Sequence, residues 1–412
     1  MKFLQLLPET LLGHSSELFS QRRYLKHMKF VSEAEIKNKK VLLRVDFNVD
    51  LDENGKILSD FRMRAALATI NYLIENGAAK VIVASHLGEP KGKEEKFSLR
   101  SVAEHLSQLL NKPVSFLTDC VGEEIKKEIN QVGNAAVWFL ENLRFHPEEK
   151  NNDEEFAREL ASLADIYVND AFGVCHRSNA SVSAITKFLP SFGGLLLKKE
   201  LDNLNKVMVS PVKPLVLILG GAKISTKLPL IKSFSGLADK ILLGGAIANT
   251  FLKANNFAVG QSLVEDEMLS EAAQIGSAET ELVLPGDFLV GESISASRAI
   301  ARRLGAVGEK EWILDIGPAS ALMYADIIQK AKTIIWNGPM GYCENPVFGE
   351  GTKKVLEAIA ASSAFSVIGG GDTLTVLEKS GLVEKISFVS TGGGAMLSYL
   401  ANEEMPGLKD LN

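Results

Sequence analysis

The sequence contains few cysteines and no long hydrophobic run. Its three cysteines, Cys120, Cys175 and Cys343, lie far apart and form no C-x-x-C pair. This pattern argues against a disulfide framework or a cysteine zinc site and indicates a reducing compartment, so we expect a cytoplasmic protein. No apolar run approaches the roughly 20 residues that a membrane helix needs, so we expect no membrane partner.

Positive charge is also scarce. The 45 lysine and arginine residues are outnumbered by 51 aspartate and glutamate residues, which gives a formal net charge of −6 at pH 7. An acidic chain is a poor general binder of nucleic acids, and these basic residues lack the aromatic interleaving typical of single-strand binding. We therefore expect no nucleic-acid partner, although a negative net charge is compatible with a local basic site.

Familiar catalytic and nucleotide-binding signatures are absent from the sequence as well. There is no G-x-G-x-x-G after an apolar run, no H-R-D or D-F-G of the protein kinases, and no G-x-S-x-G or H-E-x-x-H. The segment from Gly88 to Lys93 only approximates a P-loop, because three residues separate its glycines and Glu94 replaces Ser or Thr. A nucleotide would have to be bound in another way.

What the sequence does contain indicates an α/β protein of two domains. Its 412 residues are too many for one ordinary domain and fit two of about 200. After Met28, short apolar runs alternate with stretches of helical periodicity, which is typical of parallel β-α-β construction. We therefore expect two similar-sized Rossmann-like domains, each a parallel sheet flanked by helices, joined by a hinge helix.

The expected boundaries follow from composition and from turn-forming residues. Residues 1–27 precede the first well-patterned segment, so we expect an extension that is disordered or that lies upstream of the true start. Residues 28–192 form the expected first domain and residues 208–399 the second. The segment 193–207 begins with two glycines, continues as a helical pattern and precedes two prolines, which predicts the interdomain helix.

Polar side chains follow the expected strands of the first half. They are Asp46, Asn48, His86, Arg144, His176 and Arg177, with Arg62 at the start of a neighbouring helix. Each alone is more simply a solvated arginine or a structural histidine. In a parallel sheet, however, all strands end at one edge, where ligands bind. Several cations at that edge favour a ligand with phosphate or carboxylate groups, which arginine binds through two hydrogen bonds.

Most expected strands of the second half end in glycine. Gly220 and Gly221 follow one of them, and Lys223 and Lys227 are spaced to share one helix face and reach phosphate oxygens. Similar turns follow other strands at Asn337–Gly341, Gly369–Thr373 and Ser390–Ala395. Glycine lets an anion approach the backbone, and free N–H groups at a helix start favour negative charge. One such turn could be a tight corner without a ligand, but the set favours a nucleotide.

In chain order, these motifs closely resemble those of the phosphoglycerate kinase family. The matching motifs of the first half are Arg44-Val45-Asp46-Phe47-Asn48, Ser85-His86-Leu87-Gly88, Glu141-Asn142-Leu143-Arg144-Phe145 and Ala171-Phe172-Gly173 with His176-Arg177. Those of the second half are Gly220-Gly221-Ala222-Lys223 with Lys227, Trp336-Asn337-Gly338-Pro339-Met340-Gly341, Gly369 to Thr373 and Ser390 to Ala395. Together they cover essentially Met28 to Asn412.

The resemblance implies a kinase that transfers phosphate reversibly between 1,3-bisphosphoglycerate and ADP, giving 3-phosphoglycerate and ATP without a covalent enzyme intermediate. It implies a hinge-bending monomer whose first domain holds the phosphoglycerate and whose second domain holds the magnesium nucleotide. It also implies that residues 400–412 pack back on the first domain. Such a transfer needs alignment and charge neutralisation more than proton chemistry.

The resemblance also assigns roles to individual residues. For the phosphoglycerate these are Asp46 and Asn48 at the glycerate hydroxyl and carboxyl region, His86, Arg144 and Arg177 at the far phosphate, His176 as a further substrate contact, and Arg62 at the reacting carboxyl. For the nucleotide they are Gly221, Ala222, Lys223, Asn337, Gly370 and Thr373, with Glu344 at the ribose and Asp372 at Mg²⁺. The group in transfer would be stabilised by Lys227 and by backbone N–H groups near Gly371 and Gly394.

The sequence departs from the usual family pattern at a few positions. Asp50 replaces a proline, Tyr342-Cys343 replaces Val-Phe, and Glu89 replaces an arginine in the substrate patch. Glu89 puts an anion in place of a cation near a phosphate site, which bears on substrate affinity more than on reaction type. A second hypothesis is a nucleotide-binding protein of this fold whose catalysis has decayed and which acts as a regulatory or adhesive partner.

Overall fold

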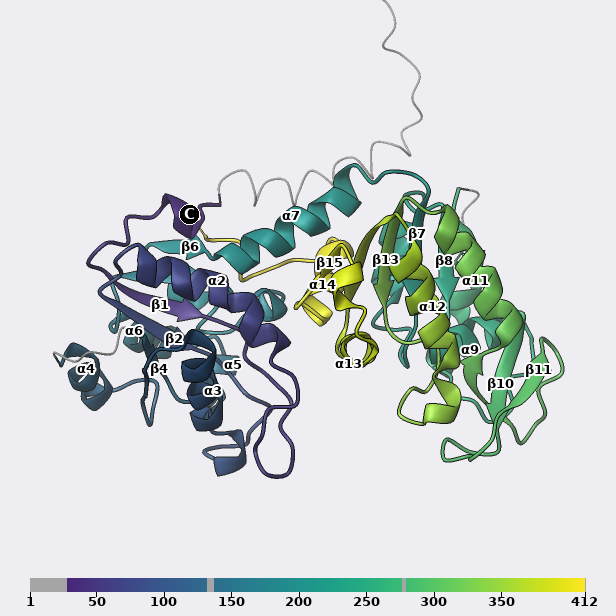
Figure 1. Ribbon diagram of the computed structural model, residues 1–412, viewed down its shortest axis with the longest axis horizontal. Helices are drawn as coiled ribbons and strands as arrows, with labels where there is room; N and C mark the ends of the chain where they lie inside the picture. Colours follow the sequence, from purple (N-terminus) through teal and green to yellow (C-terminus); the bar gives the residue numbers. More distant parts are fainter. Residues whose placement is uncertain (1–27, 132–136, 276–278, 412) are drawn as a thin grey trace, which may run out of the picture. The chain divides into compact units, whose positions relative to one another are not determined.

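The computed structural model describes residues 28–131, 137–275 and 279–411, so the expected extension at residues 1–27 lies outside the described part. The chain divides into two compact units. The first ends at Asp202 and also includes the segment from Asn402 onward, and the second is Asn203–Ala401. The division falls within helix α7 (Leu195–Val209), which is labelled in Figure 1.

The first unit is built on a six-stranded parallel sheet with the strand order β3-β4-β2-β1-β5-β6. Its strands are β1 (Lys40–Arg44), β2 (Lys80–Ala84), β3 (Val114–Phe116), β4 (Val137–Phe139), β5 (Ile166–Asn169) and β6 (Ser191–Gly193). All but β6 were expected from the apolar runs. Single 3₁₀ turns connect several elements: η1 (Val31–Glu33), η2 (Glu95–Phe97), η3 (Leu143–Phe145), η4 (Phe172–Val174) and η5 (Ala184–Lys187).

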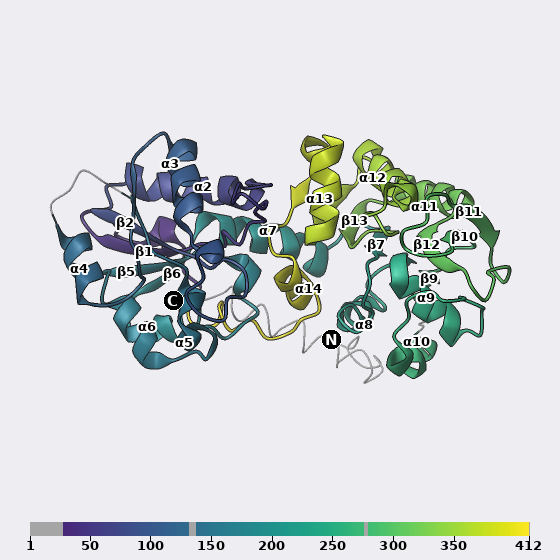
Figure 2. The same cartoon turned by 90° about the horizontal axis from the view of Figure 1, so that it is seen from below.

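Helices cover both faces of this sheet, as Figure 2 shows. Helices α2 (Phe61–Glu75) and α3 (Arg100–Leu110) lie on one face, and α5 (Pro147–Lys150) and α6 (Glu154–Ala161) lie on the other. Helix α4 (Glu123–Asn130) follows β3 in the chain. Both faces are therefore covered, which explains why the strands read as continuous apolar runs and not as alternating ones.

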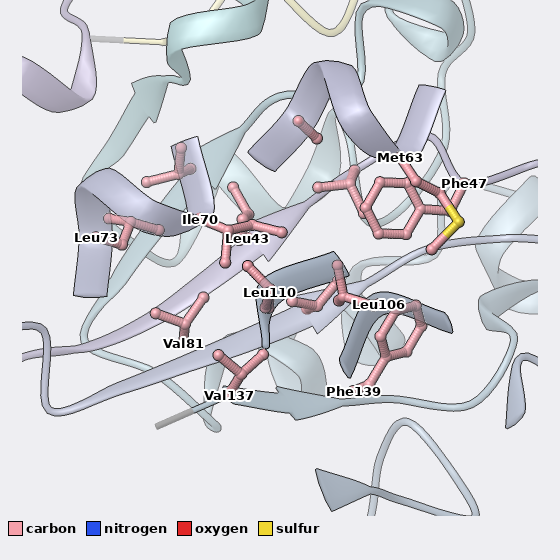
Figure 3. Packing of buried hydrophobic residues seen from close by; sticks show 14 of the residues in the cluster. Leu43, Phe47, Met63, Ile70, Leu73, Val81, Leu106, Leu110, Val137 and Phe139 are labelled. Carbon is pink, nitrogen blue, oxygen red and sulfur yellow. The ribbon is translucent and has the colours of Figure 1, made fainter. Parts of the chain in front are cut away.

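The hydrophobic core of the first unit lies between the sheet and helices α2 and α3. Figure 3 shows Leu43 and Val81 of the sheet close to Ile70 and Leu106 of the two helices. The buried apolar residues of α2 are Met63, Ala66, Ile70 and Leu73, which recur every three or four positions and so form one face. Each large apolar side chain buried in this way contributes about 1.5–3 kcal/mol. This packing fixes the strand ends that carry the polar residues.

The second unit repeats the parallel architecture with the strand order β15-β14-β13-β7-β8-β9. The strands are β7 (Leu215–Leu219), β8 (Lys240–Leu243), β9 (Glu281–Val283), β13 (Thr333–Asn337), β14 (Phe365–Gly369) and β15 (Phe388–Val389). In Figure 2, one face carries α8 (Leu228–Phe234), α9 (Gly245–Ala254), α10 (Leu269–Gln274) and α14 (Gly394–Leu400). The other carries α11 (Pro318–Lys330), α12 (Glu350–Ala361) and α13 (Gly371–Ser380), and the unit's 3₁₀ turns are η6 (Asp266–Met268), η7 (Pro346–Phe348) and η8 (Val383–Lys385).

A small antiparallel sheet adds to this second unit and was not expected from the sequence. Its strand order is β11-β10-β12, with β10 (Asp287–Gly291), β11 (Ile300–Arg303) and β12 (Trp312–Ile316). The apolar run in β12 predicts a strand, but we expected a parallel one. The expectation was wrong because hydrophobicity indicates a strand without indicating its partner. Side chains of β10 form a separate core with Leu252 and Val307.

The end of the chain packs on the first unit. The backbone N–H of Gly407 donates to the carbonyl of Cys175 at 2.9 Å, and the Asn169 side chain donates to the Gly407 carbonyl at 3.0 Å. The Lys29 N–H donates to the Leu411 carbonyl at 3.2 Å. None of the helices in the described part of the chain is long and apolar enough to span a membrane.

Candidate functional site

In the first unit, polar side chains from four strand ends gather at one edge of the sheet. Asp46 follows β1, His86 follows β2, Arg144 lies in η3 after β4, and Arg177 lies just beyond η4. All strands are parallel, so these positions share the carboxyl edge. Four arginines lie close enough to His86 for their charges to lower its pKa: Arg44, Arg144, Arg62 and Arg177. The edge therefore concentrates positive charge, as predicted.

Arg44 determines which ring nitrogen of His86 carries the proton, although the sequence assigned Arg44 no role. Its guanidinium is 1% exposed, donates to Ser181 Oγ at 2.9 Å and lies 3.9 Å from Glu149 Oε1. A second guanidinium nitrogen lies 3.2 Å from His86 Nδ1, and because arginine only donates, Nδ1 accepts and the ring proton is on Nε2. Burial, reinforced by the arginine charges, lowers the pKa of His86 well below its usual value. The neutral ring thus offers its Nε2–H as a donor.

Arg62 is held at the edge by the segment that follows β1. Its guanidinium donates to the Asn48 carbonyl at 2.8 Å and lies 3.7 Å from Asp46 Oδ2. The Asn48 side-chain oxygen accepts the Gly88 N–H at 2.8 Å, which ties the segment after β1 to the one after β2. About a quarter of the Arg62 side chain remains exposed, so it can still meet a ligand.

Arg144 is the buried cation of the edge, and it pairs with Glu89. Its side chain is 4% exposed and donates to the Gly88 carbonyl at 2.8 Å and to Glu89 Oε1 at 2.7 Å. Burial lowers the pKa of Arg144 from its usual value, with Glu89 opposing that effect. The other Glu89 oxygen accepts from Lys150, and Arg177 lies 3.6 Å from Oε1. Glu89 thus faces the cation cluster.

His176 lies beside Arg177 at the rim of this cluster. The Arg177 Nε donates to His176 Nε2 at 3.3 Å. The other ring nitrogen, Nδ1, is buried and has no hydrogen-bond partner among the described residues. Burial, helped by the charge of Arg177, lowers the pKa of His176, so the ring is neutral at pH 7.

In the second unit, an apolar cavity of about 340 Å³ opens beside the strand ends. Four of the predicted nucleotide residues line it: Gly221, Ala222, Glu344 and Asp372. The unexpected antiparallel sheet supplies much of the remaining lining, including Phe288, Trp312 and Leu314. A cavity with apolar walls and a few polar groups at its margin suits a flat aromatic ligand. The sequence motifs missed these apolar residues because they carry no distinctive pattern.

The glycines of this unit serve two different purposes. A Cβ on Gly220 would lie 2.0 Å from the Pro339 carbonyl oxygen, and a Cβ on Gly338 would lie 2.2 Å from the Gly220 carbonyl oxygen. These two glycines are therefore required by the packing of neighbouring loops. At Gly371 a Cβ would have no neighbour within 4 Å, so the space beside that backbone is open to a ligand.

The predicted arrangement of Lys223 and Lys227 was wrong. Helix α8 begins only at Leu228, with Lys227 as its N-cap and Pro229 in its first turn, where proline is favoured. The lysines therefore do not share a helix face, and Lys223 lies in the preceding loop, exposed. Lys227 is half-buried and donates to Asn337 Oδ1. Burial lowers the pKa of Lys227 to about 8, while the charge of Asp372 opposes that shift.

The turn after β14 presents the start of α13 to solvent. Gly370 caps the helix with a φ of 108°, a conformation that favours glycine, and Asp372 lies exposed in the first turn. Thr373 is buried, and its hydroxyl accepts the Gly338 N–H at 2.8 Å. Asn337 donates to the Gly369 carbonyl at 2.8 Å, which links this turn to the one after β13. Helix α14, like α13, begins at a glycine, which is Gly394.

The model of the phosphoglycerate kinase family matches residues 31–403 of the chain. The chain belongs to the phosphoglycerate kinase family. A curated phosphoglycerate kinase from Aquifex aeolicus is 47% identical over 390 residues, which cover 93% of this chain and 98% of that protein. Another, from Desulfosudis oleivorans, is 45% identical over 392 residues, with the same two coverages.

Solved structures of the phosphoglycerate kinase family agree with this chain in fold. The phosphoglycerate kinase from Coxiella burnetii superposes with a TM-score of 0.80 at 38% identity, covering 93% of this chain and 98% of that one. The one from Pyrococcus horikoshii gives 0.83 at 35% identity, with the same coverages. The predicted resemblance and the predicted two-domain α/β fold are confirmed. Family membership makes the chain a glycolytic kinase, a phosphotransferase whose acceptor is a carboxyl group.

Proposed function

We propose that the chain transfers a phosphoryl group reversibly between 1,3-bisphosphoglycerate and ADP, giving 3-phosphoglycerate and ATP. One observation carries the proposal: a member of this family has a cation-rich sheet edge in one unit and an apolar cavity beside an open helix start in the other. The two sites are chemically suited to a small polyanion and to a nucleotide, respectively.

The phosphoglycerate would bind at the edge of the first unit. Asp46 and Asn48 would hold the glycerate hydroxyl and carboxyl region, and Arg62 would orient the reacting carboxyl group. The far phosphate would be bound by His86, Arg144 and Arg177, with His176 as a further contact. The buried Arg144 and the Nε2–H of neutral His86 support this, because both are donors already fixed by their neighbours.

The nucleotide would bind in the second unit, with its base in the apolar cavity and its ribose near Glu344. Its phosphates would lie toward Gly221, Ala222 and Lys223 on one side and toward Gly370 and Thr373 on the other. Asp372 fits a magnesium site, because Mg²⁺ binds through one or two carboxylates together with substrate phosphates, and this carboxylate is exposed at the cavity margin. When bound, the ion would neutralise phosphate charge.

Transfer would be in line and would need no covalent intermediate. The acceptor is a carboxylate, which is already a nucleophile, so no general base is required. Lys227 would follow the moving group, and the N–H groups of Gly371 and Gly394 would stabilise its charge. Closure of the two units would bring acceptor and donor together and exclude water from the acyl phosphate.

A coupled assay with ATP, magnesium and 3-phosphoglycerate tests the proposal on the full-length protein. The unmodified protein should turn over, and Lys227→Ala should lose about 10²- to 10³-fold in rate, as is typical when one transition-state donor is removed. Lys232→Ala is the matched control, because Lys232 is a surface lysine of α8 paired with Glu271. Absence of turnover together with normal ATP binding would favour the regulatory protein with decayed catalysis.

The proposal also includes a cytoplasmic monomer. Light scattering on a sizing column would check the mass against 44.7 kDa. A stable dimer would contradict the proposed monomer but would leave the proposed reaction unchanged.

A further inference from the structure

Glu89 places a carboxylate among three cations at the edge of the first unit. Arg144 donates to Oε1 at 2.7 Å, Lys150 donates to Oε2, and Arg177 lies 3.6 Å from Oε1. The three cations come from separate parts of the chain: η3, the end of α5 and the segment after η4. Charged donors converging on two oxygens in this way are typical of a bound anion.

The Glu89 carboxylate is held by its ion pairs more than by burial. Its side chain is 57% exposed, whereas that of Arg144 is 4% exposed. Partial burial opposes its charged form, but the hydrogen bond from Lys150 and the charges of Arg144 and Arg177 together lower the pKa of Glu89. Ion pairs as exposed as these are individually weak. The carboxylate is therefore ionised and can be displaced.

The backbone beside Glu89 is anchored independently of its side chain. The Gly88 N–H donates to Asn48 Oδ1 at 2.8 Å, and the Gly88 carbonyl accepts from Arg144 at 2.8 Å. The Glu89 side chain can therefore turn toward solvent while this loop and Arg144 stay in place.

We propose that Glu89 is a specificity-determining residue that occupies the phosphate position until a more highly charged anion displaces it. The inference rests on the proposed function and deepens it. A phosphate ester carries a charge near −2 and three strong acceptor oxygens, so it can satisfy all three cations and release Glu89. A lone carboxylate has the same charge as Glu89 and gains nothing by replacing it. The phosphate position therefore admits a phosphate ester and excludes a lone carboxylate, with some loss of affinity for the phosphorylated acid.

Calorimetric titration of the full-length protein with 3-phosphoglycerate, inorganic phosphate and glycerate tests this inference. Glu89→Gln keeps the shape of the side chain and removes its charge, so the Kd for 3-phosphoglycerate should fall about 3- to 10-fold. Glycerate carries no phosphate group to displace Glu89, so its Kd should change less than twofold and the preference for the phosphorylated acid should widen. In steady state KM should fall while kcat changes less than twofold. Glu94→Gln is the control, because Glu94 lies five residues away and pairs with Lys96.

Glu89→Ala is a second variant that guards against new hydrogen bonds made by glutamine. Tighter binding by both variants, with no change in the control, supports the inference. Unchanged or weaker binding by both variants overturns it even if turnover is normal. If the unmodified protein shows no turnover, the proposed function fails, and the titration with inorganic phosphate still decides the role of Glu89.

Discussion

The two units share a six-stranded parallel sheet flanked by helices, but they offer different groups to an anion. At the edge of the first unit the donors are side chains, among them Arg62, Arg144 and Arg177. In the second unit the open donors are backbone N–H groups at the start of α13, with Lys227 as a half-buried cation nearby. Side-chain donors can be retuned by one substitution, as Glu89 illustrates, whereas backbone N–H groups are present whatever the side chain.

The strongest test of this comparison removes one cation from the first unit. Arg62→Ala should lower kcat by about 10²- to 10³-fold, because its donor is fixed by the Asn48 carbonyl and no backbone group substitutes for it. Arg64→Ala, two residues further along α2, removes an exposed arginine that pairs with Asp60. Its activity should stay within about twofold. Coupled-assay kinetics measure both, and equal losses would show that the general charge of α2 matters and not the position of Arg62.

The second test separates the two kinds of glycine in the second unit. Gly338→Ala should lower the free energy of unfolding by about 1–3 kcal/mol, because Gly338 has a φ of 88° and a Cβ would meet the Gly220 carbonyl. Gly371→Ala should unfold like the unmodified protein, since its Cβ meets open space, yet bind ATP more weakly. Urea unfolding and ATP titration measure the two properties. A destabilised Gly371→Ala would mean that this turn, too, is set by packing.

Much of the fold could be predicted because strands of a parallel sheet are buried on both faces and read as apolar runs. Where burial is one-sided the prediction failed: β11 alternates half-buried and exposed residues and offers no such run. The polar edge was predictable because residues after parallel strands must meet. The pairing of Glu89 with Arg144 and Lys150 was not, because it depends on where long side chains turn in space.

Each unit contains a buried aspartate, and the hydrogen bonds of these two aspartates give the comparison with the smallest expected effect. Burial raises the pKa of Asp170 and of Asp315 from 3.8 to about 7. In the unfolded chain each carboxyl loses its proton at a lower pH than in the folded chain. Proton binding therefore stabilises the folded state fully below about pH 4, and this contribution is lost as the pH rises to about 7. Each group therefore gives a slope of at most about 1.4 kcal/mol per pH unit over that range.

Their hydrogen bonds differ, so asparagine should act differently at the two positions. One Asp170 oxygen accepts the Leu197 N–H at 3.0 Å, and the other has no partner among the described residues. Asp170→Asn should therefore keep the bond from Leu197 and flatten the fall in unfolding free energy between pH 5 and pH 8. Asp315 accepts backbone N–H groups on both oxygens, from Ile316 at 2.9 Å and Gly351 at 2.8 Å. An amide there would turn a donor toward a donor, so Asp315→Asn should be less stable already at pH 5. Urea midpoints at the two pH values decide this, and an unchanged slope in Asp170→Asn would show that its carboxyl ionises normally in the folded chain.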